Sequence, residues 1–198
     1  EPGLMVIRGS LAPDGALVKL AAVPAGIRRF VGTAKVFEDE SLAIDGLRTG
    51  AVQPGQVIVL RMLGPRGGPG TVFAASFMAA LVGAGRGADV AVVTDGELSG
   101  LNSGITIGQV MPEAAEGGPL AAVRDGDFIE LDCTTGRLHL DVSDEELAAR
   151  LAQVTPPEHA MKGGYQRLYV NHVLQADQGC DFEFLVGCRG SAVPRHSH

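Results

Sequence analysis

The stretch 128-FIELDCTTGRLHLDV-142 decides what kind of fold the chain can adopt. Apolar and polar residues alternate in Phe128–Asp132 and again in 137–142, which is the period of a strand with one buried face. Between the two segments, Thr135-Gly136 supplies the chemistry of a turn. We therefore expect a hairpin of two antiparallel strands here, inside a β-rich body.

Further segments in the first half of the chain are short, apolar and rich in β-formers, which favours strands. They are residues 4–8, 17–23, 30–37, 57–62 and 89–93. The turn signal Pro13-Asp14-Gly15 precedes the second of them, so the chain is expected to reverse there.

Helices are predicted between and after these strands. Residues 38–50 end at a glycine, and residues 73–83 are rich in alanine and apolar side chains, which indicates a buried helix. Ser143 and Glu146 form a capping box, and another helix is expected near 169–176, before an irregular tail. No repeat or linker divides the chain, so we expect one domain, 1–198, with helices packed outside the strands.

The composition argues against several classes of protein. The net charge is −7, the basic residues are scattered and there is no Trp, so no nucleic-acid surface is expected. No apolar run reaches the roughly 18 residues of a membrane span, and the N-terminus lacks a signal-peptide pattern. Three cysteines do not suggest a disulfide framework, which favours a reducing, cytoplasmic setting.

The glycine loop 64-GPRGGPG-70 precedes the alanine-rich helix. Exposed amides at a helix start can hold an anion, so a carboxylate or other anion site is one interpretation. A tight corner between strand and helix is the other. The loop lacks the Gly-Lys-Ser/Thr ending of a Walker loop and the GxGxxG pattern of a dinucleotide site. The pattern alone leaves both interpretations open.

The stretch 94-TDGELSG-100 follows the apolar segment 89–93. Ser99 comes after the end of that expected strand, where functional groups are commonly placed. It could be a catalytic serine, or a turn or cap residue. The stretch does not match the nucleophile elbow G-x-S-x-G, and no histidine stands near it in the sequence.

No metal site is predicted from the chain's own residues. Cys180 and Cys188 are eight residues apart, with His172 upstream, and this spacing matches no zinc pattern. Structural roles are expected for the thiols, including that of Cys133. The carboxylates of the hairpin and of the helix start after it are expected to be solvated or capping groups.

Several longer motifs occur together in one order. They are VIRGSLAPDGALVKLAAV, GPRGGPG, TDGELSG, VMPEAAEGGPLAAVRDGDFIELD, LDVSDEELAAR and YVNHVLQADQGCDFEFLVGCRGSAVPRHSH. In this order they resemble the C-terminal half of the dihydroxy-acid and sugar-acid dehydratase family. The last motif is similar to the end of the sugar-acid branch, and the resemblance covers nearly all 198 residues.

The resemblance implies a fold and a reaction. The C-terminal half of these enzymes is a β-barrel-like domain flanked by helices, akin to a swivelling domain, so the implied class is α+β with a mixed sheet. The enzymes dehydrate a 2,3-dihydroxy carboxylate to a 2-keto acid through an enol. They are dimers or tetramers, their active site lies between this domain and the N-terminal half, and they use an iron–sulfur cluster and a magnesium ion.

The resemblance also implies roles for particular residues. The serine of T-D-G-x-x-S-G, the family's proposed base for the C2 proton, corresponds to Ser99. The implied substrate-binding residues are Thr94, Asp95, Gly67, Gly68 and Gly70. The family's cluster cysteines lie in its N-terminal half, which this chain lacks, so the chain alone is expected to be inactive. The position of the family's magnesium-binding glutamate holds Phe73, whose ring offers no oxygen ligand.

Two hypotheses remain. In the first, the chain is the C-terminal part of a hydro-lyase that acts on a sugar acid or a related dihydroxy acid together with its own N-terminal domain. In the second, it is a catalytically degenerate paralogue that serves as a binding or assembly domain, which Phe73 in place of a carboxylate favours.

Overall fold

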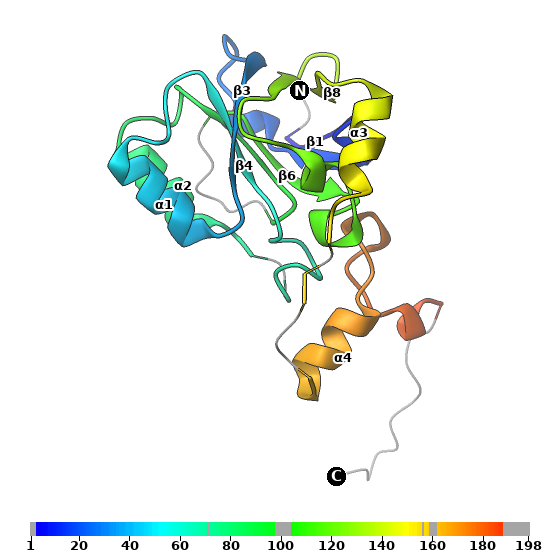
Figure 1. The fold of residues 1–198 in the computed structure, drawn as a ribbon. Helices are drawn as coiled ribbons and strands as arrows, with labels where there is room; N and C mark the ends of the chain where they lie inside the picture. The colour runs from blue at the N-terminus through cyan, green and yellow to red at the C-terminus, as the bar shows by residue number, and fades with distance from the viewer. Residues whose placement is uncertain (1–2, 71, 98–103, 156, 159–161, 188–198) are drawn as a thin grey trace.

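Eight strands close into a barrel in the computed structural model, which describes residues 3–70, 72–97, 104–155, 157–158 and 162–187 (Figure 1). The strands are β1 Met5–Gly9, β2 Ala12–Val18, β3 Arg29–Phe37, β4 Gln56–Leu60, β5 Ala91–Thr94, β6 Thr106–Met111, β7 Phe128–Asp132 and β8 Arg137–Leu140. Their order around the barrel is β1-β2-β6-β5-β4-β3-β7-β8, and β1 pairs with β8 to close it. The expected α+β, barrel-like mixed sheet is confirmed.

The parallel part of the sheet decides where the loops gather. β3, β4, β5 and β6 run parallel to one another, with Val57 of β4 opposite Ala91 of β5. β2 and β7 run antiparallel to β6 and β3. The carboxyl ends of the four parallel strands therefore lie at the same end of the barrel.

Strand β4 shows why the parallel strands are continuously apolar. Val57 and Val59 belong to the core inside the barrel, whereas Ile58 and Leu60 belong to the core beneath the helices, and all four are fully buried. The β7–β8 hairpin forms as predicted, with Ile129 opposite Leu140. Its alternate residues complete the interior: Ile129, Leu131, Leu138 and Leu140.

Helices pack on more than one side of the barrel and extend beyond it (Figure 1). They are α1 Glu40–Thr49, α2 Ala75–Gly83, α3 Asp144–Leu151 and α4 Gly164–His172, with 3-10 turns η1 Leu20–Ala22, η2 Ala114–Glu116, η3 Pro119–Ala122, η4 Ala176–Gln178 and η5 Glu183–Leu185. α1 and α2 lie together against the β4 and β5 side, and α4 stands off the barrel (Figure 1). None of the helices formed by the described residues is long and apolar enough to cross a membrane.

The ends of two helices follow the sequence signals. α1 ends at Gly50, which adopts the left-handed conformation (φ 80°) that favours glycine. α3 begins after Ser143, whose hydroxyl accepts the amide of Glu146 at 3.2 Å. This bond confirms the serine half of the capping box. The Glu146 side chain, which was expected to reach back to Ser143, pairs with Arg150 at 2.7 Å.

The strand expected at 17–23 is wrong. β2 occupies Ala12–Val18, and η1 follows it at Leu20–Ala22. Pro13-Asp14-Gly15 lie within this strand, and its pairing with β6 shifts register beside Gly15 (φ 118°). The turn residues are accommodated by a register shift in the strand pairing. Pairing of β2 with both β1 and β6 outweighs the local preference of Pro13-Asp14-Gly15 for a turn.

Two helices begin elsewhere than expected. α2 begins at Ala75 because Ala74 has left-handed backbone (φ 36°), so position 73 lies outside the helix. The last helix spans Gly164–His172, not 169–176, and ends where Val173 forms a bridge with Phe182. Of the expected irregular tail, residues 188–198 lie outside the described residues.

Candidate functional site

Loops that follow three parallel strands meet at one end of the barrel. They are the glycine loop 64–70 after β4, the segment 95–97 after β5 and the segment 112–118 after β6. Groups from different strands converge at the carboxyl ends of parallel strands, where open α/β sheets bind their ligands. This end of the barrel is therefore the candidate site.

Asp95 joins these loops at their bases. Its carboxylate is 1% exposed and accepts the amides of Leu63 and Ala114 at 2.9 Å each and that of Met62 at 3.2 Å. Burial, together with a smaller effect of the Glu113 charge, raises the pKa of Asp95 to about 6 against the lowering effect of these amides. One carboxylate thus fixes the start of the glycine loop and the start of the segment 112–118.

The residues beside Asp95 hold their segment against the glycine loop. The Thr94 hydroxyl, which is buried, accepts the amide of Gly96 at 2.9 Å. The amide of Glu97 donates to the carbonyl of Val72 at 3.0 Å. A Cβ on Gly96 would lie 2.5 Å from that same carbonyl, so the close approach of the two segments requires glycine.

The glycine loop uses its inner amides within the chain. The amides of Arg66 and Gly67 each donate to the Glu113 carboxylate at 2.9 Å. The amide of Gly68 donates to the carbonyl of Gly64 at 2.9 Å. Since Glu113 is 1% exposed, a buried carboxylate of the chain itself lies on these amides.

The start of α2 also has an internal acceptor. The amide of Phe77 donates to the Glu40 carboxylate, at the start of α1, at 2.8 Å. The loop and the helix start, which the sequence offered as an anion site, therefore both hold carboxylates that the chain supplies.

Left-handed backbone at residues other than glycine concentrates around these loops. Met62 (φ 65°) and Ala74 (φ 36°) bracket the glycine loop, and Gln109 (φ 51°) lies in β6. The amide of Gln109 donates to the carbonyl of Gly96 at 2.8 Å. Such conformations cost of order 1–3 kcal/mol each and cluster at functional sites, where the surroundings hold them.

The segment after α4 reaches the same loops. The Gln175 amide group donates to the Glu113 carboxylate at 2.7 Å, and its oxygen accepts the Glu113 backbone amide at 2.9 Å. The Arg66 guanidinium donates to the carbonyl of Val173 at 3.2 Å and pairs with Glu116 at 2.6 Å. The C-terminal segment is thereby attached to the glycine loop.

Sequence reasoning brought only part of this site together. The structure gathers Thr94, Asp95 and the glycine loop at one end of the barrel, with Gly70 exposed at the loop's outer end. Ser99 lies outside the described residues, and substrate contact stays a prediction for all of these positions. Glu113 was missed, although it follows an apolar strand, the same signal that singled out Ser99.

The described residues do not fit an iron–sulfur cluster or a magnesium ion. Among them there is no group of three or more His, Cys, Asp or Glu side chains that could hold a metal. Cys133 lies in the barrel core and Cys180 is half-buried, and burial raises the pKa of both thiols, which disfavours the thiolate form that binds metals. Phe73 is 48% exposed, and Cys188 lies outside the described residues.

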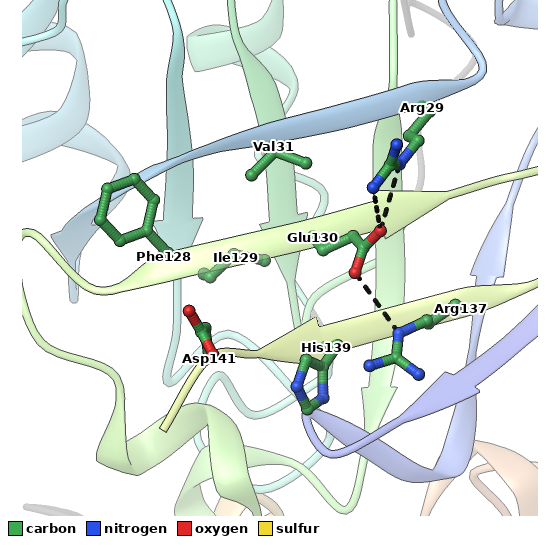
Figure 2. Close-up of a pocket in the computed structure, with 8 residues that line it drawn as sticks. All are labelled: Arg29, Val31, Phe128, Ile129, Glu130, Arg137, His139 and Asp141. Carbon is green, nitrogen blue, oxygen red and sulfur yellow. Dashed lines mark hydrogen bonds and ion pairs between the residues drawn. The ribbon is translucent and has the colours of Figure 1, made fainter. Parts of the chain in front are cut away.

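A separate hollow lies on the outer face of β3, β7 and β8 (Figure 2). Glu130 pairs there with Arg29 at 2.8 Å and with Arg137 at 3.5 Å, so one carboxylate is shared by two guanidinium groups. His139 lies beside them, with its Nδ1 2.9 Å from the hydroxyl of Ser10. The walls of this hollow come from strands and share no residue with the strand-end loops.

A closed mixed barrel with a site built from strand-end loops defines the class of this protein as an α+β barrel domain. The family model for the dihydroxy-acid/6-phosphogluconate dehydratase C-terminal domain matches residues 1–180, and the chain belongs to this family. The resemblance drawn from the motifs is thereby confirmed.

Curated relatives agree with the family. The chain is 44% identical to an L-arabonate dehydratase of Azospirillum brasilense, over 100% of this chain and 36% of that protein. It is 46% and 49% identical to dihydroxy-acid dehydratases of Pyrobaculum neutrophilum and Pyrobaculum calidifontis, over 89% of this chain and 31% of each relative. The chain therefore spans about a third of the length of the curated relatives it matches.

Proposed function

We propose that this chain is the C-terminal part of a hydro-lyase, which dehydrates a 2,3-dihydroxy carboxylate to a 2-keto acid. The observation that carries the proposal is the family match over residues 1–180, together with relatives named L-arabonate dehydratase and dihydroxy-acid dehydratase. The strand-end loops support it, because they are the part of the barrel where groups from several strands converge. The substrate class is a sugar acid or a related dihydroxy acid.

In this proposal Ser99 is the base. It takes the proton from C2 while the C3 hydroxyl leaves, so one water is lost and the resulting enol becomes the 2-keto acid. Thr94 and Asp95 act by fixing the segment that leads to Ser99, since their side-chain oxygens accept backbone amides. Gly67, Gly68 and Gly70 shape the wall of the site, of which Gly70 is the exposed end.

The cofactors and partners belong to the proposal as well. The resemblance implies an iron–sulfur cluster and magnesium, with the cluster ligands in the N-terminal half. We propose that the domain works with its own N-terminal half, in a homo-oligomer and in the cytoplasm. The free thiols of Cys133 and Cys180 are compatible with a reducing compartment.

The proposal is tested with the full-length gene product, purified with its cofactors and offered a panel of sugar acids and dihydroxy acids. Ser99→Ala should lower kcat by about a thousandfold or more, because the proton acceptor is removed. Ser103→Ala is the matched control in the same segment and should stay within about threefold of wild type. Unchanged turnover in Ser99→Ala would show that the base is another group.

A second candidate function is that of a catalytically degenerate domain used for binding or assembly. Phe73 favours it, because an exposed phenyl ring stands where the resemblance expects a magnesium-binding glutamate. The test is Phe73→Glu in the full-length product. Magnesium-dependent dehydration that is gained in this variant and missing in wild type would support degeneracy, whereas turnover by wild type with Phe73 in place would exclude it.

A further inference from the structure

We infer that the glycine loop is a carboxylate-binding loop whose anion is built into the chain, with Glu113 filling it as a positioning residue of the candidate site. The sequence left two interpretations of this loop open, an anion site and a tight corner. The contacts show that both interpretations hold: the loop is a tight corner, and the anion that its amides bind is the Glu113 carboxylate. The consequence for catalysis rests on the proposed function, but the contacts themselves do not.

The Glu113 carboxylate is saturated by hydrogen-bond donors. Its Oε1 accepts the Arg66 amide at 2.9 Å and the Gln175 side chain at 2.7 Å. Its Oε2 accepts the Gly67 amide at 2.9 Å and the Arg66 amide at 3.1 Å. Successive main-chain amides that converge on one anion are the arrangement by which glycine-rich loops bind carboxylates and phosphates.

The negative charge of Glu113 is stabilised by main-chain amides of the loop and by the side-chain amide of Gln175. The Arg66 guanidinium, the nearest candidate cation in the loop, pairs with Glu116 and donates to the Val173 carbonyl. At 1% exposure, Glu113 has little contact with water. A buried carboxylate is costly unless its oxygens are hydrogen-bonded, so the loop conformation and the glutamate depend on each other.

The glycines of the loop fit this interpretation. A Cβ on Gly64 would overlap the carboxylate of Glu113, so glycine there admits the side chain to the loop. A Cβ on Gly67 would lie 2.9 Å from the carbonyl carbon of Met62, which keeps the loop close to its own base. Glycine at these positions therefore brings the amides within reach of Glu113.

Glu113 also connects the loops of the site to one another. The amide of its neighbour Ala114 donates to Asp95, and the same carboxylate also holds the base of the glycine loop. Gln175 attaches the segment after α4 to the same carboxylate. Loss of Glu113 should therefore move the outer end of the glycine loop relative to the segment that enters Ser99.

Hydrogen exchange of the glycine loop tests the inference in the full-length gene product. In Glu113→Ala, the amides of Arg66 and Gly67 should exchange at least about tenfold faster, because they lose their acceptor. Sodium acetate should restore their protection, whereas sodium chloride at equal ionic strength should not, since only a carboxylate fits the vacated position. Glu116→Gln is the matched control, because it removes the ion pair of Arg66 and leaves the loop amides bonded.

A second variant covers the case in which Glu113→Ala does not fold. Glu113→Gln keeps the side-chain volume but has a single oxygen, so protection should fall without a response to acetate. Unchanged protection of Arg66 and Gly67 in either variant would overturn the inference. So would protection in Glu113→Ala that chloride restores as well as acetate.

The catalytic consequence is measured separately, by kcat and KM of the same variants. Glu113→Ala should raise KM at least about tenfold, with acetate reversing most of the change. Asp45→Asn, a carboxylate-to-amide change on the exposed surface of α1 and outside the strand-end loops, should match wild type. If wild type turns over no dihydroxy acid, the proposed function fails while the exchange result still decides the role of Glu113. If wild type is active and the loop amides are unaffected, the inference fails while the function stands.

Discussion

At the scale of single residues, the candidate site depends on buried carboxylates that accept backbone amides. Asp95 and Glu113 are each 1% exposed, and between them they accept amides from the glycine loop, from its base and from the segment after β6. Both therefore position the backbone. Burial raises the pKa of Asp95 to about 6.

Asp95 should make the chain less stable as the pH rises through about 6. Its folded pKa of about 6 lies above the ordinary value of 3.8, so the folded state binds the proton more tightly than the unfolded state. This stabilisation is complete below about pH 3.8 and is lost as the pH rises through about 6, a change of about 3 kcal/mol.

Urea unfolding of wild type and Asp95→Asn across this range of pH measures the effect. The free energy of unfolding of wild type should fall relative to that of the variant by about 3 kcal/mol, because asparagine does not titrate. Asp45→Asn, on the exposed surface of α1, should follow wild type. A difference between wild type and Asp95→Asn that stays constant with pH would contradict the assignment.

At the scale of elements, the pair of helices α1 and α2 forms a second core against the outer face of β4 and β5. Phe77 is its largest fully buried side chain, and Met78 and Leu81 lie beside it. The layer also fixes the start of α2, since Glu40 of α1 accepts the Phe77 amide. The glycine loop is thus supported from the helix side as well as by Glu113.

Phe77 and Phe73 form a matched pair for testing this layer. Phe77→Ala should lower the free energy of unfolding by about 3–5 kcal/mol, because it empties a buried site. Phe73→Ala removes the same ring from a position that is 48% exposed, and should change stability by less than about 1 kcal/mol. Urea titration of both variants measures the contrast, and equal losses would show that the two rings are packed alike.

At the scale of the whole molecule, the barrel carries a C-terminal segment that stands apart from it (Figure 1). The loops after β4 and β6 attach it to the barrel, because Arg66 donates to the Val173 carbonyl and Glu113 accepts the Gln175 amide group. The segment has its own aromatic contacts, with Tyr169 and Phe182 at 5.6 Å between ring centroids. A change at the loop should therefore reach the C-terminal segment before it reaches the barrel.

Arg66→Met should loosen the C-terminal segment selectively. The variant keeps an apolar stem but loses the donor to Val173 and the pair with Glu116, so amides of α4 should exchange several-fold faster while β4 and β5 stay protected. Hydrogen exchange resolved by peptide measures both regions. Arg48→Met, which removes an exposed pair on α1, should leave α4 unchanged, and equal acceleration in barrel and segment would contradict the expectation.

Features that depend on neighbouring residues and on motif order were predictable from the sequence. Alternation set the β7–β8 hairpin, Gly50 set the end of α1, Ser143 set the start of α3, and the ordered motifs indicated the family. The three-dimensional fold was needed to show that β1 and β8 close the barrel and that β2 runs through a turn signal. It also decided that Glu113 fills the glycine loop, through contacts between residues 46 and 47 positions apart. Local spacing carries no information about such contacts, because they form only when distant strands bring their ends together.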